Sequence, residues 1–538
     1  MKVVLGDMAV VMSELPACVA DAGQFKLRLP KSADELKADK MVYDEMKARG
    51  LNPRKPNRFR FEQHDMIAAT PDGSFAFLPG LWPRVQQELD GAGIKYVLED
   101  LRSQDIRPAP DYSALADAEF RPGQAEALAL IASSDCGIIK CATAWGKSFC
   151  ISKLCRMFPT LNIVVTTSSS QVVGTLYDRI KQECPGEVGL ICGTKNTAEG
   201  KRIICCTLRS LEKVNPEGIQ LVLVDEVHGV GANQAGLVLS QFVFARRFGF
   251  SASPVRNDGS AKALEAIMGP VILDVSYADA VSSGMVVPLK YVMLPCNRGP
   301  EFLRDIVGAD GIKHRKGIPD VFRKKFSYWR NSARNRQIAS CVQRILEVDP
   351  DCQILVIVET LQHAVLLHQL IPNFLVAHYG ASSMDELADD KKFSHIDLSR
   401  YMLKPKELDR IRGAFAKGTL RRVISTFVFR QGVDFKALKV IIRADGRLSE
   451  VDGIQIPGRV ARLSEGKDCG YIIDLRDTQD EWAQQRAQQR EQFYQEQGWT
   501  ESTIEEMLDD IRRARDKCVT DCTGDVQGNE PEEDSGTS

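Results

Sequence analysis

The stretch GIIKCATAWGKSFC, Gly137 to Cys150, decides how the rest of this chain is organised. Its apolar start predicts a strand, and the small residues that follow predict a turn into Gly146-Lys147-Ser148. This order is typical of a phosphate-binding loop, whose backbone N–H groups surround phosphate oxygens. Lys147 would contact the β- and γ-phosphates of a nucleotide, and the Ser148 hydroxyl would bind Mg²⁺. Cys141 stands where the usual pattern has its first glycine, so a chance Gly-Lys-Ser turn is the alternative at this point.

Length and composition restrict the class of protein. The chain has 538 residues, too many for one core, and a prior of about 150 residues per domain predicts three or four domains. Its 70 Lys and Arg against 72 Asp and Glu give a net charge of −2, so nucleic-acid contacts would need local patches. No apolar run reaches about 18 residues and no signal peptide is evident, so we expect an intracellular protein without a membrane span. Most of the 15 cysteines stand singly in apolar segments, which favours reduced thiols over zinc ligands.

Residues 1–112 predict a small α+β module, with short alternating segments and a helix from Trp82 to Gly91. Between Lys47 and Arg60 there are six cations and no acid, beside aromatic side chains. Such a patch suits a nucleic-acid backbone, and it suits equally a solvated turn with two core aromatics. The segment RPAPD, Arg107 to Asp111, predicts a linker because two prolines interrupt regular structure.

From Ala118 onwards, apolar runs alternate with helical segments, which predicts a parallel sheet. The runs are Asn162–Val165, Ile203–Cys206, Leu221–Val224 and Phe248–Phe250. Each ends in polar residues, where an open α/β sheet gathers its ligand. After the third run, Asp225 would hold a nucleotide-bound Mg²⁺ and Glu226 would orient the attacking water. The alternative is that Asp225 and Glu226 are a helix-capping or surface pair of acids without a role in catalysis.

A second α/β unit follows a long connection, residues 299–345. Its predicted strands are Ile354–Val358, Arg422–Ser425, Val440–Ile442 and Tyr471–Asp474. From Arg304 to Arg336 there are ten Lys and Arg against three acids, with aromatic rings among them. This pattern indicates either a nucleic-acid surface or an amphipathic helix that covers the domain with its rings. Residues 381–408 look like an insertion.

The end of this unit carries QIPGRVAR, residues 455–462. Its two arginines, Arg459 and Arg462, are three apart on the first turns of a predicted helix and point the same way, which suits contact with a γ-phosphate. Beyond Asp480 the pattern predicts helices at Glu481–Gln497 and Glu501–Lys517. The acidic residues 519–538 are expected to be disordered.

In their order and spacing, these motifs resemble those of the superfamily 2 helicases and translocases, over residues 118–475. The matching segments are Gln124 in RPGQ, ATAWGKS (142–148), DEVH (225–228), Ser251-Ala252-Ser253, Thr426 with QGVD (431–434), and QIPGRVAR. The resemblance implies an α/β protein with two tandem RecA-like P-loop domains, a small α+β N-terminal module and a helical C-terminal extension. The expected bounds are 1–112 for the module, 113–290 and 291–480 for the two domains, and 481–538 for the extension and tail.

The resemblance also implies ATP and Mg²⁺ as cofactors. The implied nucleotide contacts are Gln124, Thr143, Ala144, Trp145, Gly146, Lys147, Ser148, Gly432 and Asp434. Ser148 and Asp225 would hold Mg²⁺, and Glu226 would activate water. Gln455, Arg459 and Arg462 would act on the terminal phosphate from the second domain. Thr167, Thr207 and Thr426 would contact the nucleic-acid backbone.

Within the superfamily, the DEVH box, the small N-terminal module and the helix with Arg334-Asn335-Arg336 look most like the XPB and phage UvsW branch of DNA helicases. This implies remodelling of branched or forked DNA in recombination, replication or repair, in the host cytoplasm if the protein is phage-encoded. An RNA helicase and a catalytically silent nucleic-acid-binding clamp are the alternatives.

Overall fold

The computed structural model describes most of the chain and separates it into two compact units. The described residues are 1–6, 9–22, 25–30, 41, 61–102, 108–230, 234–242, 244–252, 261–296, 320–378, 384, 387–429, 435–448, 457–464, 466–479 and 481–524. One unit comprises residues 1–142 with 146–276, and the other residues 143–145 with 277–538. None of the described helices combines the length and apolar composition that crossing a membrane requires.

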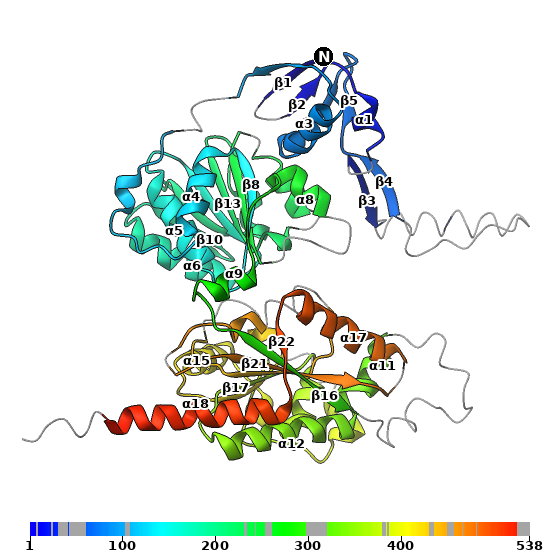
Figure 1. Ribbon diagram of the computed structural model, residues 1–538, viewed down its shortest axis with the longest axis vertical. Coiled ribbons are helices and arrows are strands. Elements are labelled where there is room, and N and C mark those ends of the chain that lie inside the picture. The colour runs from blue at the N-terminus through cyan, green and yellow to red at the C-terminus, as the bar shows by residue number, and fades with distance from the viewer. Residues whose placement is uncertain are drawn as a thin grey trace, which may run out of the picture. The chain divides into compact units, whose positions relative to one another are not determined.

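The N-terminal module contains a five-stranded sheet and a separate two-stranded hairpin (Figure 1). The sheet has the order β5-β6-β2-β1-β7, with β1 Lys2–Leu5, β2 Val10–Met12, β5 Ala68–Ala69, β6 Phe75–Phe77 and β7 Val97–Asp100; the hairpin joins β3 Lys26–Pro30 to β4 Phe61–Asp65. Helix α3, Trp82–Gly91, is where the sequence predicts it, and its Val85 and Leu89 are buried in the module's core. The basic segment between Lys47 and Arg60 lies outside the described residues.

The module packs closely against the first α/β domain, within one unit. A short 3₁₀ turn, η2 Pro79–Leu81, lies on helix α8, Ala261–Met268. A Cβ added to Gly80 would stand 2.5 Å from the carbonyl oxygen of Ala266, so only glycine allows this approach. Next to it, Arg84 forms an ion pair with Glu265. The module is therefore a built-in part of the first unit.

The first α/β domain has an eight-stranded sheet in the order β11-β10-β12-β9-β13-β14-β8-β15, parallel except at β11. Its strands are β8 Cys136–Cys141, β9 Ile163–Thr167, β10 Val188–Cys192, β11 Lys195–Asn196, β12 Ile203–Thr207, β13 Leu221–Asp225, β14 Arg246–Ser251 and β15 Val271–Val275. Its main helices are α4 Gln124–Ser133, α5 Lys147–Met157, α6 Ser170–Glu183, α7 Gln234–Leu239 and α8. Every residue of the central strand β13 is buried, as expected for a parallel strand covered on both faces.

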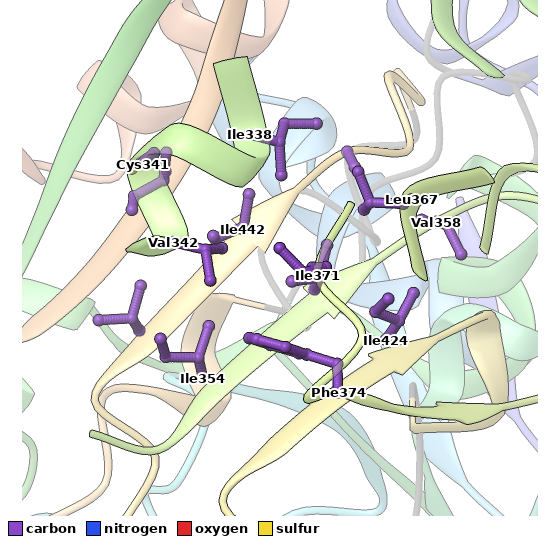
Figure 2. Close-up of a cluster of buried hydrophobic side chains, with 14 of the residues drawn as sticks. Ile338, Cys341, Val342, Ile354, Val358, Leu367, Ile371, Phe374, Ile424 and Ile442 are labelled. Atoms are coloured by element: carbon purple, nitrogen blue, oxygen red, sulfur yellow. The ribbon is translucent and has the colours of Figure 1, made fainter. Parts of the chain in front are cut away.

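The second α/β domain has a seven-stranded parallel sheet in the order β18-β19-β17-β20-β21-β16-β22. The strands are β16 Leu289–Cys296, β17 Ile354–Ile357, β18 Leu375–Ala377, β19 Arg422–Ser425, β20 Val440–Arg443, β21 Gly470–Asp477 and β22 Thr500–Glu501. Its main helices are α12 Ser332–Val348, α13 Leu361–His368, α15 Pro405–Ala416, α17 Glu481–Glu496 and α18 Ile504–Gly524. In its core, Ile338 and Val342 of α12 lie over Ile354 of β17 and Ile442 of β20 (Figure 2).

Three parts of the second unit differ from the sequence-based expectation. The C-terminal extension is not a separate element, because β22 pairs with β16 and the α18 side chains Met507 and Ile511 are buried in the domain core. Helix α18 also continues to Gly524, into the segment expected to be disordered. Within the basic connection, Tyr328 and Trp329 are buried, so these two rings cover the domain and are not free for stacking.

A buried ionic network connects α17 to the second sheet. Arg490 is fully buried; its Nε lies 2.9 Å from Asp474 and its Nη2 lies 3.3 Å from Asp477. Arg334 of α12 binds the other side of Asp477 at 2.8 Å. Burial alone would raise the pKa of Asp474, but the guanidinium groups of Arg490 and Arg443 lower it below its ordinary value. Because all these charges are buried, each depends on its partners.

We expect Arg490→Leu to lower the free energy of unfolding by about 3–5 kcal/mol, because the buried carboxylates of Asp474 and Asp477 lose a cation. The matched control is Arg512→Leu, since Arg512 forms an exposed ion pair with Asp509 and should change stability by about 0.5 kcal/mol or less. Urea unfolding of the full chain, followed by circular dichroism, measures both. Equal stability of the two variants would contradict a stabilising role of the network.

Candidate nucleotide and nucleic-acid site

The loop from strand β8 into helix α5 has the backbone shape that a phosphate-binding loop requires. Thr143, Ala144 and Trp145 form the turn, and α5 begins at Lys147. Ala144 and Gly146 have positive φ angles, 70° and 111°, so the backbone turns sharply just before the helix. At the start of α5 the N–H groups of Lys147 and Ser148 have no helical acceptor and can bind an anion, whereas the Phe149 N–H donates to the Gly146 carbonyl at 2.9 Å. The Cys141 departure from the usual pattern therefore does not prevent the loop from forming.

Three charged side chains meet beside this loop. Lys147 Nζ lies 2.5 Å from Glu226 Oε1, and the lysine side chain is 12% exposed. Asp225 ends β13 and is buried; burial raises its pKa to about 7, although the positive charge of Lys147 opposes this rise. Burial would lower the pKa of Lys147, but the carboxylates of Glu226 and Asp225 raise it above its ordinary value. The sequence-predicted Lys147, Asp225 and Glu226 are thus brought together in one cluster.

Glu226 is held in a strained position by the turn that follows β13. Its φ and ψ are both 53°, the left-handed region that non-glycine residues rarely adopt. Its carboxylate lies between Lys147 and His228, whose Nδ1 is 3.3 Å from Oε2. Such backbone strain is often found at functional sites, where the surrounding structure maintains it.

His228 connects this cluster to the next strand. Its Nδ1 lies 3.0 Å from Ser251 Oγ at the end of β14, and both side chains are buried. The sequence identified DEVH and Ser251-Ala252-Ser253 as motifs but not this contact. His228 and Ser251 lie at or just beyond the carboxyl ends of neighbouring parallel strands, β13 and β14, and this shared position could have indicated their contact.

Gln124 of the RPGQ segment lies close to the loop. Its Oε1 accepts a hydrogen bond from the Arg121 N–H at 2.9 Å. A Cβ added to Gly146 would stand 2.5 Å from Gln124 Nε2, so the amide and the loop are near neighbours. Phe120 packs edge-on against Phe149 of α5, which fixes this segment to the same helix.

The two threonines proposed for backbone contact lie side by side. Thr167 ends β9, Thr207 ends β12, and the two residues pair in the sheet. Both are buried, and the Thr207 hydroxyl is 3.0 Å from Ser210 Oγ. Two exposed groups at this edge, which the sequence analysis did not single out, are Ser168, directly after Thr167, and Arg209, two residues after Thr207.

The second unit carries the remaining predicted residues. Thr426 follows β19, and its N–H donates to the Ala377 carbonyl at 3.0 Å. Arg459 lies in a 3₁₀ turn, η10 Pro457–Arg459, where an α-helix was predicted, and its guanidinium stacks over the Phe435 ring. Burial lowers the pKa of Arg462 to about 10.

Three further predicted residues of the second unit, Gln455, Gly432 and Asp434, lie outside the described residues. The action of Arg459 and Arg462 on the nucleotide stays a prediction.

We expect Gly146→Ala to destabilise the loop by about 1–3 kcal/mol, because a side chain at a φ of 111° is strained and its Cβ would meet Gln124. The matched control is Gly174→Ala in α6, where an added Cβ meets nothing within 4 Å. This change should stabilise the helix by up to about 1 kcal/mol. Hydrogen exchange of the first turn of α5 and thermal unfolding measure both variants; unchanged protection in Gly146→Ala would contradict the strained geometry.

Large parts of this chain are similar to known proteins. Residues 117–256 match the family model of the type III restriction enzyme res subunit. The DNA 3'-5' helicase XPB of Kineococcus radiotolerans is 24% identical over 57% of this chain and 47% of its own length. The DNA 3'-5' translocase XPB2 of Sulfurisphaera tokodaii is 22% identical over 64% of this chain and 79% of its own length. The chain spans about half the length of several curated relatives it matches.

Among solved structures, Saccharomyces cerevisiae Dbp5 bound to RNA and ADP BeF3 has a TM-score of 0.50. It is 14% identical, and the match covers 77% of this chain and 99% of that chain. This likeness shows the fold, two tandem RecA-like domains, as the sequence predicted. The fold, the ordered set of motif residues and these relatives together support a superfamily 2 helicase.

Proposed function

We propose that this protein is an ATP-dependent DNA helicase or translocase that remodels branched or forked DNA. The observation that carries the proposal is the cluster of Lys147, Asp225 and Glu226 beside an anion-binding loop at one end of the sheet. The XPB relatives, named as a DNA helicase and a DNA translocase, support DNA as the partner. Action on branched structures, in recombination or repair, is the finer part of the proposal and follows the resemblance to the XPB and UvsW branch.

The residues present suit ATP with Mg²⁺, and ATP would supply the phosphoanhydride bond whose hydrolysis would drive movement. The start of α5 offers the N–H groups of Lys147 and Ser148, and Lys147 offers an ammonium group for phosphate. Burial raises the pKa of Asp225, and a divalent cation beside its carboxylate would oppose this rise. Asp225 and the Ser148 hydroxyl would hold that cation.

Glu226 can change partners in this scheme. It now pairs with Lys147, and a phosphate group would compete for the same ammonium group. A released Glu226 carboxylate would orient the attacking water, while His228 remains beside it at 3.3 Å. Arg459 and Arg462 of the second domain, with Gln455, would stabilise the phosphoryl group during its transfer. An arginine that stabilises the transition state in this way raises the rate by about 10³–10⁵-fold.

Nucleic acid would be gripped at the same edge of each sheet. The ends of β9 and β12 carry Thr167 and Thr207, and the exposed Ser168 and Arg209 next to them can reach phosphates. Thr426 after β19 would make the equivalent contact in the second domain. Contacts to phosphates alone carry no sequence information, so movement would be independent of base sequence.

We expect Lys147→Ala and Glu226→Gln each to reduce DNA-stimulated ATP hydrolysis by at least about 10²-fold, because each removes a group acting on the phosphates or on water. Lys147→Ala should also weaken nucleotide binding, whereas Glu226→Gln should retain it. The controls are Lys181→Ala and Glu199→Gln, both exposed residues of the same domain. A steady-state ATPase assay with forked DNA measures all four, and full activity in either site variant would refute the assignment.

The substrate class is tested by the same assay with forked DNA, single-stranded DNA and single-stranded RNA. The proposal expects the largest stimulation with forked DNA. Stimulation by RNA alone would favour the RNA helicase, because 2′-OH contacts distinguish the two polymers. Binding of nucleic acid without hydrolysis by the unaltered protein would favour the silent clamp.

A further inference from the structure

A cavity of about 320 Å³ lies between the N-terminal module and the first α/β domain, within one compact unit. It opens at the starts of β8 and β14, the edge of the sheet opposite to Asp225 and Ser251. The module contributes Leu5, Val10, Pro79, Trp82 and Pro83, and the domain contributes Ala245, Pro270 and Ile272. Its walls are therefore mainly apolar, and its volume is that of a small-molecule site, for which about 300 Å³ or more is usual.

Three arginines line this cavity, and two of them have strong partners. Arg102 forms an ion pair with Asp135. Arg246 donates to the carbonyl oxygens at the end of helix α4, among them Ser134 at 2.7 Å. Both guanidinium groups are thus bound by groups of the chain, as is usual for arginines at helix ends and in ion pairs.

Arg247 is different. It is 4% exposed, and its one hydrogen bond among the described residues is from Nη1 to the Phe242 carbonyl at 3.4 Å. Its buried Nε has no hydrogen-bond partner there. No carboxylate of the described residues acts on it, and burial lowers its pKa. A buried cation that has no counter-charge among the described residues is costly, so an anion that enters the cavity would be favoured beside this guanidinium.

We propose that this cavity binds a small organic monoanion, an aryl or alkyl carboxylate, with the carboxylate on Arg247 and the apolar body against Trp82 and Pro83. A planar guanidinium binds a carboxylate through two parallel hydrogen bonds, which fixes the orientation of the ligand. The apolar walls then remove the ligand body from water. This binding site is independent of nucleotide and nucleic acid, and it goes beyond the function proposed above.

The test uses the full chain and three probes in isothermal titration calorimetry: 1-naphthoate, the neutral 1-naphthalenemethanol, and acetate. We expect 1-naphthoate to bind at micromolar to millimolar concentration, and the neutral probe to bind at least about tenfold more weakly because it cannot pair with the guanidinium. Acetate should give no measurable binding, since it has no apolar body. Absence of 1-naphthoate binding, or equal affinity for the neutral probe, would overturn the proposal.

Two variants locate the site. Arg247→Met keeps the length of the side chain without its charge, and it should weaken 1-naphthoate at least about tenfold, whereas Lys195→Met, at an exposed cation of the same sheet, should not. Trp82→Phe keeps the aromatic wall; the probe should still bind, but the change in tryptophan fluorescence on binding should fall. Circular dichroism confirms folding. Full affinity in a folded Arg247→Met, or an unchanged fluorescence response in Trp82→Phe, would overturn the site.

Discussion

The candidate site of the first domain is built on one ammonium group and two carboxylates, held together with little access to water at the end of β13. Burial penalises each charge, and the pKa of Asp225 is raised to about 7 in consequence. Lys147 offsets this penalty only in part, because it is shared with Glu226 at 2.5 Å. A cluster of this kind adds little to stability, since desolvation opposes the ionic attraction. Under the proposed function, an incoming phosphate and cation would replace the internal ion pairs of this cluster.

The buried charges of this protein fall into two kinds. In the second domain, Arg490 has carboxylate partners in Asp474 and Asp477 and a further acceptor in the Leu475 carbonyl, so its donors are well used. In the first domain, Glu226 is strained and shares one lysine. A fully satisfied network fixes a structure, whereas a residue held in a strained backbone conformation is often found where a ligand is bound. The same criterion distinguishes Arg247 from its neighbour Arg246.

Much of the fold and the nucleotide cluster could be predicted from the sequence. The strands β9, β12, β13 and β14 stand out as apolar runs with polar ends, and Lys147 and Asp225 lie in patterns set by phosphate chemistry. Strand β22 could not be predicted, because the two residues Thr500 and Glu501 have no periodicity and are placed only by pairing with β16. Tyr328 and Trp329 stand in a basic segment that reads equally well as surface, and only packing against α17 decides that they are buried.

The dependence of the second sheet on its last strand has a consequence for biosynthesis. The first unit ends at Ser276, so it can fold while the remainder is still being translated, apart from the short 143–145 turn. The second domain begins with β16 but cannot complete its core until the buried Ile511 of α18 has left the ribosome. Strand β16 therefore stays unpaired until β21 and β22 have been made, and its backbone N–H and C=O groups are open to non-native pairing for much of the domain's synthesis.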